Sequence, residues 1–359
     1  MSLTVAITKK LHTSELDVSF SSRDGHLGLL GESGSGKSMT LKCIAGIETP
    51  DEGFIEIDGT VVYDSTRGIN LSPQQRNTGY LFQNYALFPH VCAWRNIEAA
   101  VPRSLAGSVR KKKVFEYLHL FGLEGIATRM PQTISGGQQQ RLALARLLAS
   151  EPSLILLDEP FSALDATIKA RIEEELAFRL SDFSGTVILV THNRDEAYRF
   201  CDDLVILQNG RVVESGQKEA LFAHCHTVAG ARITGCANVA TGLKAGPMRV
   251  AVPDWGVLLE TTGTVPDGDF YVGVRSHHVR LRHKGDDTNC IDFEITGRTV
   301  SPYSVTERLV ALTPAGFAGG ERLVREFFIR EYAYNGETVS SDLSRVTLHI
   351  PPDSVQILV

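Results

Sequence analysis

The sequence carries little net charge, and this limits the partners that it can attract. Its 359 residues include 36 Lys and Arg against 42 Asp and Glu, which leaves a formal charge of −6 at pH 7. Nucleic-acid binding depends on basic surfaces that neutralise phosphates, so this balance predicts no nucleic-acid partner. The one basic run of the sequence, Arg110 to Lys113, is interpreted as a solvated helix face.

Long apolar runs are also lacking. No stretch approaches the roughly 20 consecutive apolar residues that a membrane-spanning helix needs. The first residues are polar by Lys9 and Lys10 and contain no signal-peptide core. We therefore expect a cytosolic protein, unless a partner holds it at a membrane. A chain of this length suits two domains.

Cysteine is scarce and scattered. The six cysteines include no Cys-x-x-Cys pair, which indicates reduced thiols in a reducing compartment. The run His224-Cys225-His226 has the composition of a metal site, but neighbours along a chain point in different directions on any regular element. We therefore expect no metal at this run.

A glycine-rich segment has the spacing of a phosphate-binding loop. It follows an apolar run, precedes a helical pattern and reads G-x-x-x-x-G-K-S: Gly31, Glu32, Ser33, Gly34, Ser35, Gly36, Lys37 and Ser38. The glycines let backbone N–H groups turn toward a polyphosphate, and the helix start adds its dipole. Lys37 supplies a charge for the outer phosphates, Ser38 supplies a hydroxyl for Mg²⁺, and Met39 continues the nucleotide-binding segment.

Candidate catalytic residues follow three other apolar runs. They are Asp158 and Glu159 after Leu154–Leu157, Thr191 and His192 after Val187–Val190, and Gln83 after Tyr80–Phe82. Ligands of open α/β sheets bind beyond the carboxyl ends of the strands. This convergence therefore predicts a nucleotide hydrolase.

Charge suggests a role for each of these residues. Asp158 would hold Mg²⁺, and Glu159 would orient or deprotonate the attacking water. His192 would donate toward the γ-phosphate, and Gln83 would reach the metal or the water through its amide oxygen. Each residue also has a structural interpretation when taken alone, since Asp-Glu pairs are common and a lone His at a strand end is often structural.

The chain divides into two regions of different pattern. Up to about residue 227, apolar runs alternate with helical patterns, which is typical of an α/β P-loop NTPase with a parallel sheet. Within it, residues of about 84–150 are helical and more polar and form a predicted helical subdomain. The last region, residues 232–359, has short β-rich runs separated by turns, which predict a barrel-like domain.

One more motif carries a family resemblance. The segment from Ile134 to Arg141 resembles the signature sequence of the ATP-binding cassette (ABC) ATPases, with Ile134 where Leu is more usual. The other family elements match as well: Gly31–Ser38 is similar to Walker A, Leu154–Asp158 to Walker B with Glu159 as catalytic carboxylate, Gln83 to the Q-loop glutamine, 162–165 to the D-loop, and His192 to the switch histidine.

The resemblance implies an ABC cassette fold over residues 1–227, an OB/TOBE-like tail, and ATP and Mg²⁺ as cofactors. Two cassettes of this family close head to tail over two ATP molecules. The nucleotide held by one cassette then faces four signature residues of the other, Ser135, Gly136, Gly137 and Gln138. One chain carries one cassette, so a homodimer or a partner cassette is implied.

One position departs from the family pattern. The family usually places an aromatic ring upstream of the phosphate loop to stack on adenine, whereas residues 1–19 contain no Tyr, Trp or Phe. Leu11 and His12 are the candidates for that contact. The preference for ATP over GTP therefore stays open.

The segment from Asn84 to His90 and the β-rich tail resemble those of importer subunits, and the whole chain resembles the ATP-binding subunits of molybdate and related oxyanion importers. This implies ATP hydrolysis at the cytoplasmic face of a membrane. The hydrolysis would energise separate integral-membrane permease subunits, to which a solute-binding protein delivers the substrate. Sulfate, iron, polyamine and sugar importers share the architecture and remain alternatives. A soluble ABC ATPase outside transport is another, although such proteins usually carry two cassettes or long coiled-coil insertions.

The tail is predicted to sense the transported anion and to lower ATPase activity when occupied. Assistance in dimer assembly is the equal alternative. The possible anion ligands of the tail lie in one segment and are Arg275, Ser276, His277, His278, Arg280 and Arg282. Strand alternation would place only about half of them on one face.

Overall fold

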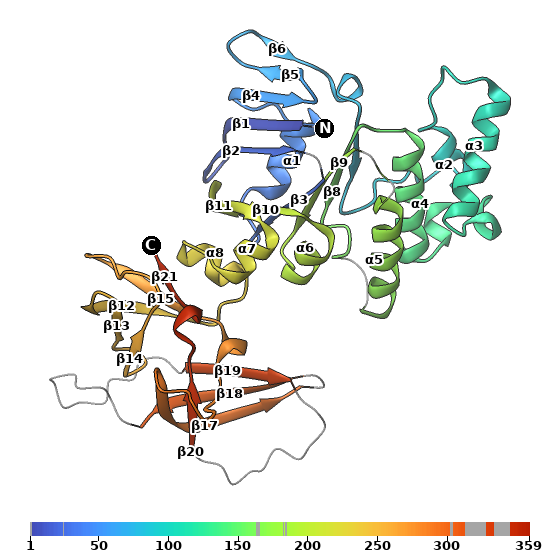
Figure 1. Cartoon of the computed structure of the whole chain (residues 1–359). Helices are drawn as coiled ribbons and strands as arrows, with labels where there is room; N and C mark the ends of the chain where they lie inside the picture. The colour runs from blue at the N-terminus through green and yellow to red at the C-terminus, as the bar shows by residue number, and fades with distance from the viewer. Residues whose placement is uncertain are drawn as a thin grey trace. The chain divides into compact units, whose positions relative to one another are not determined.

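The computed structural model describes residues 2–23, 25–162, 166–181, 183, 185–301, 304–312, 328–333 and 345–359. The chain forms two compact units, Met1–Lys218 and Glu219–Val359 (Figure 1). Each unit has its own sheets and its own apolar core. The division falls at the start of helix α7, Lys218–Ala223.

An eleven-stranded sheet runs through the first unit in the order β6-β5-β4-β1-β2-β11-β10-β3-β9-β8-β7. In chain order the strands are β1 Ser2–Lys10, β2 Glu15–Arg23, β3 His26–Gly31, β4 Glu52–Ile57, β5 Thr60–Asp64, β6 Ile69–Asn70, β7 Thr78–Leu81, β8 Leu154–Asp158, β9 Thr186–Thr191, β10 Asp203–Gln208 and β11 Arg211–Gln217. Neighbours from β10 to β7 pair in parallel, whereas β1 pairs antiparallel with β2 and β4. The carboxyl ends of β3, β9, β8 and β7 therefore meet at one end of the sheet.

Helices occur where the apolar spacing predicts them. Helices α1 (Lys37–Ala45), α5 (Ala166–Ser181) and α6 (Arg194–Phe200) follow β3, β8 and β9 along the chain. Between β7 and β8 lie α2 (Ala93–Glu98), α3 (Gly107–Leu120) and α4 (Gly136–Ala149), within the predicted helical interval (Figure 1). Short 3₁₀ turns occupy Pro73–Gln75, Glu124–Ile126, Pro131–Thr133, Ser276–His278 and Pro352–Ser354. In the described part of the chain, no helix has the length and apolar character needed to cross a membrane.

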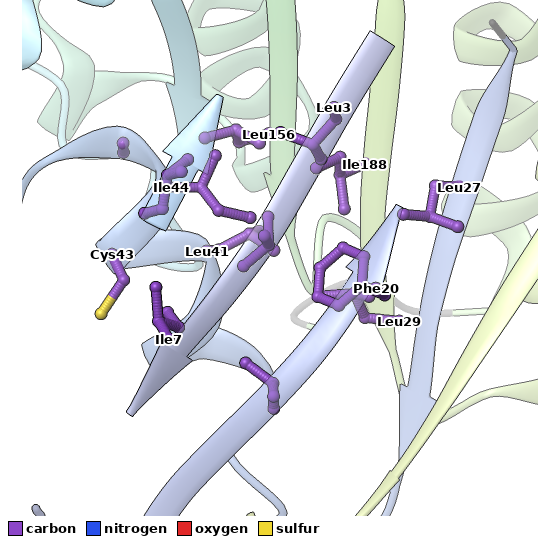
Figure 2. Packing of buried hydrophobic residues seen from close by; sticks show 14 of the residues in the cluster. Leu3, Ile7, Phe20, Leu27, Leu29, Leu41, Cys43, Ile44, Leu156 and Ile188 are labelled. Carbon is purple, nitrogen blue, oxygen red and sulfur yellow. The ribbon is translucent and has the colours of Figure 1, made fainter. Parts of the chain in front are cut away.

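The core of the first unit explains the continuous apolar runs. Every residue of β8 and β9 is buried, as expected for parallel strands that are covered on both faces. Leu41 and Ile44 of α1 join Leu156 of β8 and Ile188 of β9 in one cluster (Figure 2). This packing fixes the positions at which these strands end.

Gly28 interrupts the apolar run of β3 for a steric reason. A Cβ atom at this position would lie 2.5 Å from Leu204 Cδ2 and 2.9 Å from Cys201 Sγ. Both distances are shorter than van der Waals contact, so a larger residue would push β10 or the end of α6 away. The glycine keeps β3 close to its neighbours without ending the strand.

The second unit confirms the predicted β-rich, barrel-like tail. After α7 and α8 (Val228–Ile233), its described residues form two five-stranded sheets, in the orders β14-β13-β12-β15-β21 and β16-β20-β17-β18-β19. Trp255, Phe270, Phe293 and Phe328 belong to one buried cluster that both sheets share. The strands are β12 Asn238–Gly246, β13 Arg249–Val252, β14 Val257–Glu260, β15 Phe270–Val274, β16 Arg280–Leu281, β17 Cys290–Val300, β18 Ser304–Ala311, β19 Phe328–Ala333, β20 Arg345–His349 and β21 Val355–Leu358.

Two of these strands are missing from the sequence prediction. The second half of β12 is mostly exposed and consists of glycine, lysine and alanine beside one leucine, which are mostly poor strand formers. Strand β19 places Arg330 in a buried position opposite Glu307, so its apolar alternation is broken. In both cases pairing with neighbouring strands outweighs the local pattern.

Candidate functional site

The glycine-rich loop joins β3 to α1, as the sequence predicts. Gly36 caps the helix with φ of 103°, a left-handed conformation, and a Cβ there would lie 2.6 Å from Leu16 Cδ1. Only glycine meets both demands without strain. Ser35 is buried, Met39 packs against the core, and the side chains of Glu32 and Ser33 are exposed.

Lys37 is held by its own loop. Its Nζ donates to the carbonyl oxygens of Gly31 and Glu32, each at 2.8 Å, and lies 3.5 Å from Ser35 Oγ. The side chain is 5% exposed, and burial lowers the pKa of its ammonium, although Glu159, Asp158 and Glu32 favour the charged form. The amine thus lies against the loop that precedes α1, and the N-terminal dipole of that helix also attracts an anion.

Asp158 lies at the end of β8 and accepts two hydroxyl hydrogen bonds. Ser38 Oγ donates to its Oδ1 at 2.7 Å, and Tyr80 Oη donates to its Oδ2 at 2.8 Å. Burial and the neighbouring carboxylate raise the pKa of Tyr80. The structure therefore brings together the two predicted oxygen donors, Ser38 and Asp158.

The sequence analysis missed Tyr80, which it treated only as an apolar strand residue. In the parallel register of β7 and β8, Tyr80 lies beside Leu156, two residues before the carboxylate. A buried tyrosine hydroxyl needs a hydrogen-bond partner. The sequence therefore indicates that the Tyr80 hydroxyl has a partner, but only the register of β7 and β8 identifies that partner as Asp158.

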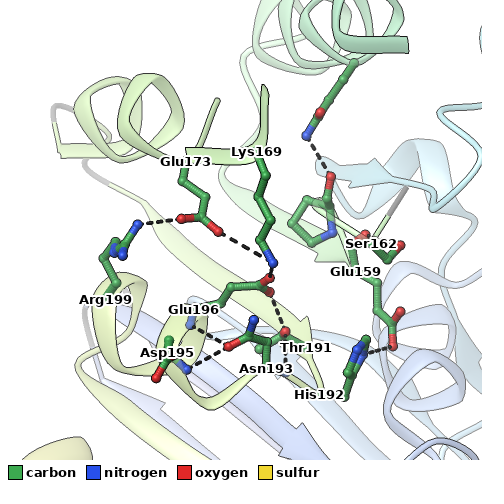
Figure 3. Close-up of polar contacts among 12 residues, drawn as sticks. Glu159, Ser162, Lys169, Glu173, Thr191, His192, Asn193, Asp195, Glu196 and Arg199 are labelled. Carbon is green, nitrogen blue, oxygen red and sulfur yellow. Dashed lines mark hydrogen bonds and ion pairs between the residues drawn. The ribbon is translucent and has the colours of Figure 1, made fainter. Parts of the chain in front are cut away.

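Glu159 and His192 meet across the ends of β8 and β9 (Figure 3). His192 Nδ1 lies 3.1 Å from Glu159 Oε1, and the Glu159 amide donates to the Val190 carbonyl at 3.0 Å. The backbone of Glu159 has φ of 45°, a conformation that costs a non-glycine residue on the order of 1–3 kcal/mol. Such cost at a strand end is typical of functional sites, where a side chain is held in one orientation.

Gln83 follows β7 and reaches the same neighbourhood. Its Nε2 lies 3.4 Å from Ser162 Oγ, which in turn donates to the Glu159 carbonyl at 3.0 Å. Ser162 begins the segment that resembles the D-loop, and residues 163–165 of that segment lie outside the described residues. The contact connects Gln83 to the backbone that carries the candidate catalytic carboxylate.

The signature segment begins α4. Ser135 is the N-cap, with its Oγ accepting from the Gln138 amide at 3.4 Å, and Gln138 Oε1 accepts from the Ser135 amide at 3.0 Å. Ser135 is exposed and Gln138 is half-buried, and the first N–H groups of a helix have no partner within the helix. Ser135 and Gln138 thus bond to each other, and the helix start with Gly136 and Gly137 is suited to a second anion.

Gln140, two residues into the helix from Gln138, was also missed. It is fully buried, and its Nε2 donates to the Pro160 carbonyl at 2.6 Å. Pro160 directly follows Glu159, so the signature helix is connected to the backbone of the Walker B region. The polar pattern Gln138–Gln140 gave no sign of which amide turns inward.

The oxygen donors at this end of the sheet fit Mg²⁺. A hydroxyl and a carboxylate, Ser38 and Asp158, already lie within hydrogen-bond distance of each other, and small hard cations prefer such oxygen ligands together with substrate phosphates. Among the described residues, no group of three or more His, Cys, Asp or Glu is arranged to hold a metal.

Comparison with known proteins gives the family. A profile of the ABC transporter family matches residues 16–162. The molybdate/tungstate import ATP-binding protein WtpC of Pyrococcus horikoshii is 37% identical over 351 residues, 94% of this chain and 95% of its own length. The chain belongs to the ABC transporter ATP-binding family. The molybdenum import ATP-binding protein ModC of Paramagnetospirillum magneticum is 39% identical over 207 residues, 58% of this chain, and the match spans 57% of that relative's length.

A solved ABC cassette has the same fold as the first unit. The dimeric cassette MJ0796, in a post-hydrolysis state with ADP and Pi, is 30% identical, with a TM-score of 0.52 over 61% of this chain and 99% of its own. The matched share is close to the size of the Met1–Lys218 unit. The predicted ABC cassette fold is therefore confirmed.

Proposed function

We propose that this protein hydrolyses ATP as the nucleotide-binding subunit of an ABC importer. The observation that carries the proposal is the meeting of functional groups at one end of the parallel sheet. Ser38 donates to Asp158, and His192 contacts Glu159. Lys37, held at the start of α1, adds the positive charge. Phosphoryl transfer to water needs this set of groups: a cation for phosphates, oxygen donors for a metal, and a base beside the attacking water.

In the proposed reaction, Lys37 and the N–H groups of its loop bind the outer phosphates of ATP. Glu159 orients a water molecule and accepts its proton. His192 would hold Glu159 through Nδ1–H. Donation from Nε2 toward the γ-phosphate at the same time requires the doubly protonated imidazolium, because a neutral imidazole has only one N–H. Magnesium bound by Ser38, Asp158 and Gln83 would neutralise phosphate charge.

We infer a homodimer in which each cassette completes the site of the other. The capped start of α4, with the exposed Ser135, offers a serine hydroxyl and N–H groups at a helix start. These groups suit the γ-phosphate of a nucleotide bound to a second copy. The solved relative MJ0796 is a dimer, which supports this arrangement.

The proposed assembly is an importer with integral-membrane permease subunits and a solute-binding protein, and the chain acts at the cytoplasmic face. The proposed substrate is molybdate or a related oxyanion such as tungstate. The WtpC relative, which matches over nearly the whole chain and thus includes the tail, supports this choice. Relatives named for sulfate/thiosulfate and for Fe(3+) import match at 42% and 41% identity over little more than half of the chain, so these substrates are the competing candidates.

The test is ATP turnover in proteoliposomes that contain the chain with the permease encoded beside it and the corresponding binding protein. Binding protein loaded with molybdate or tungstate should raise turnover, and the same protein with sulfate or Fe³⁺ should not. An unloaded binding protein and the Glu159→Gln variant are the controls. Stimulation by sulfate or iron alone would refute the oxyanion assignment, and absence of any ATP hydrolysis would refute the enzyme.

A further inference from the structure

Hydrogen bonds fix the backbone turn on both sides of His192. Thr191, the last residue of β9, is 1% exposed. Its hydroxyl accepts a hydrogen bond from the backbone amide of Asn193 at 3.0 Å, so this bond joins the residues on either side of His192. Asn193 Oδ1 accepts from the amides of Asp195 and Glu196 and caps α6. The backbone around His192 is thereby fixed to the first turn of α6.

The same hydroxyl connects this turn to a buried carboxylate. Thr191 Oγ1 donates to Glu196 Oε2, and Lys169 of α5 donates to Glu196 Oε1 (Figure 3). Glu196 is 6% exposed. Neither Glu196 nor Lys169 contacts a group with a role in the proposed reaction, yet a buried carboxylate is costly unless all its partners are present. Removing one partner would therefore disturb Thr191, which adjoins the histidine.

A second bridge joins the same two helices without touching the turn. Arg199 of α6 donates to Glu173 of α5 at 2.5 Å, on the side of α6 away from Thr191 (Figure 3). The two bridges are connected, because Lys169 Nζ also lies 3.8 Å from Glu173 Oε1. Only the Glu196 bridge reaches Thr191, however, and Arg199 is at the far end of the network.

We propose that Glu196, neutralised by Lys169 and bonded to Thr191, is a positioning residue that sets the contact of His192 with Glu159. This inference rests on the proposed ATP hydrolysis and adds to it a positioning device. The device is the set of bonds from Lys169 of α5 through Glu196 to Thr191, beside His192. Helix α5 begins directly after the segment that resembles the D-loop. The device therefore connects the helix that follows this segment to the turn around His192. Loss of the device should misplace the imidazole while ATP binding is retained.

Four variants test the proposal. Thr191→Val and Glu196→Gln should each lower kcat about 10- to 100-fold, because displacement of a catalytic group by about 1 Å has effects of this size. The KM for ATP should stay within about twofold, because ground-state binding is unchanged. Thr191→Ser keeps the hydroxyl and should restore most of the turnover. Arg199→Gln breaks the other bridge between the helices and should leave kcat close to wild type.

A second measurement does not depend on turnover. In histidine-labelled protein, the imidazole signal of His192, assigned among the 11 histidines by its loss in His192→Gln, should shift in Thr191→Val and Glu196→Gln but not in Arg199→Gln. Unmoved His192 signals would overturn the proposal, as would an equal fall of kcat in Arg199→Gln or a changed KM at constant kcat. A wild-type chain without ATPase activity would refute the proposed function, and the imidazole signals would still decide whether Glu196 positions His192.

Discussion

The buried charges of the second unit differ in their partners from the two carboxylates at the end of β8, Asp158 and Glu159. In the second unit, Arg275 is 2% exposed and donates to the carbonyls of Thr234 and Leu221. Glu307 is 1% exposed and accepts from Arg298 and Arg330 on the neighbouring strands. These groups bond to fixed backbone or to opposite charges, as buried charges in a stable core must.

At the end of β8 in the first unit, the two carboxylates have weaker or exchangeable partners. Asp158 accepts from two neutral hydroxyls, Ser38 and Tyr80. Glu159 contacts an imidazole whose side chain is 55% exposed. Burial of charge therefore does not by itself mark a functional site. A functional site is indicated where charged groups at strand ends have partners that a ligand can replace.

Two of the residues predicted to bind an anion in the tail already have partners within the protein. Of its candidate ligands, Arg275 is occupied by backbone carbonyls, and Arg280 binds Asp286 through two hydrogen bonds of 2.9 Å. Both arginines therefore have structural roles. Anion sensing by the remaining residues of the segment stays a prediction, with assembly as the alternative.

The largest expected effect on turnover is that of Glu159→Gln. The amide keeps the shape but cannot accept the proton of water, so kcat should fall by about 10²- to 10⁴-fold. Nucleotide binding should be retained, as measured by filter binding of labelled ATP. Glu151→Gln, at an exposed glutamate, is the matched control. Near wild-type turnover of Glu159→Gln would mean that another group is the base.

Lys37→Ala should act on binding instead. Loss of charged hydrogen bonds worth about 1.5–3 kcal/mol should weaken ATP affinity about 10- to 100-fold. Calorimetric titration with ATP measures the change, and Lys42→Ala in the same helix is the control. Unchanged affinity would contradict the assignment of the loop.

A smaller effect is expected for Tyr80→Phe. The variant removes one hydrogen bond of about 1 kcal/mol from Asp158, so the Mg²⁺ concentration for half-maximal turnover should shift about fivefold. Tyr117→Phe, whose hydroxyl donates to the Leu148 carbonyl, should shift nothing. If both variants behave alike, Tyr80 has only a packing role.

The smallest effect on turnover is expected from the second unit. Glu307→Gln removes the buried carboxylate that accepts from Arg298 and from the buried Arg330, and breaking such a pair costs about 3–5 kcal/mol. Thermal unfolding should show this loss, while kcat per folded chain should stay at the wild-type value. A fall in kcat at a temperature where the chain is folded would show that the two units are not functionally distinct in the way described.

The sequence predicted β8 and β9 and the residues at their ends because both strands are continuous apolar runs followed by polar residues. Strand β3 was predicted from its apolar run, although Gly28 interrupts it, and from the glycine-rich loop that follows it. The sequence did not predict Tyr80 or Gln140, since their partners depend on strand register and on the packing of α4 against the Walker B region. Strands β12 and β19 were missed because cross-strand pairing, not local alternation, stabilises them. The adenine contact, for which Leu11 and His12 are candidates, stays a prediction.

The most direct test of the central claim is complementation between two inactive variants. Lys37→Ala removes the loop charge of its own chain, and Ser135→Arg blocks the signature that would face the partner's nucleotide. Each variant alone should trap no labelled ATP in a closed dimer, whereas their mixture should form one intact composite site per mixed dimer. Trapped ATP and turnover that appear only in the mixture are the predicted result. A mixture no more active than the two separate variants would contradict the head-to-tail site.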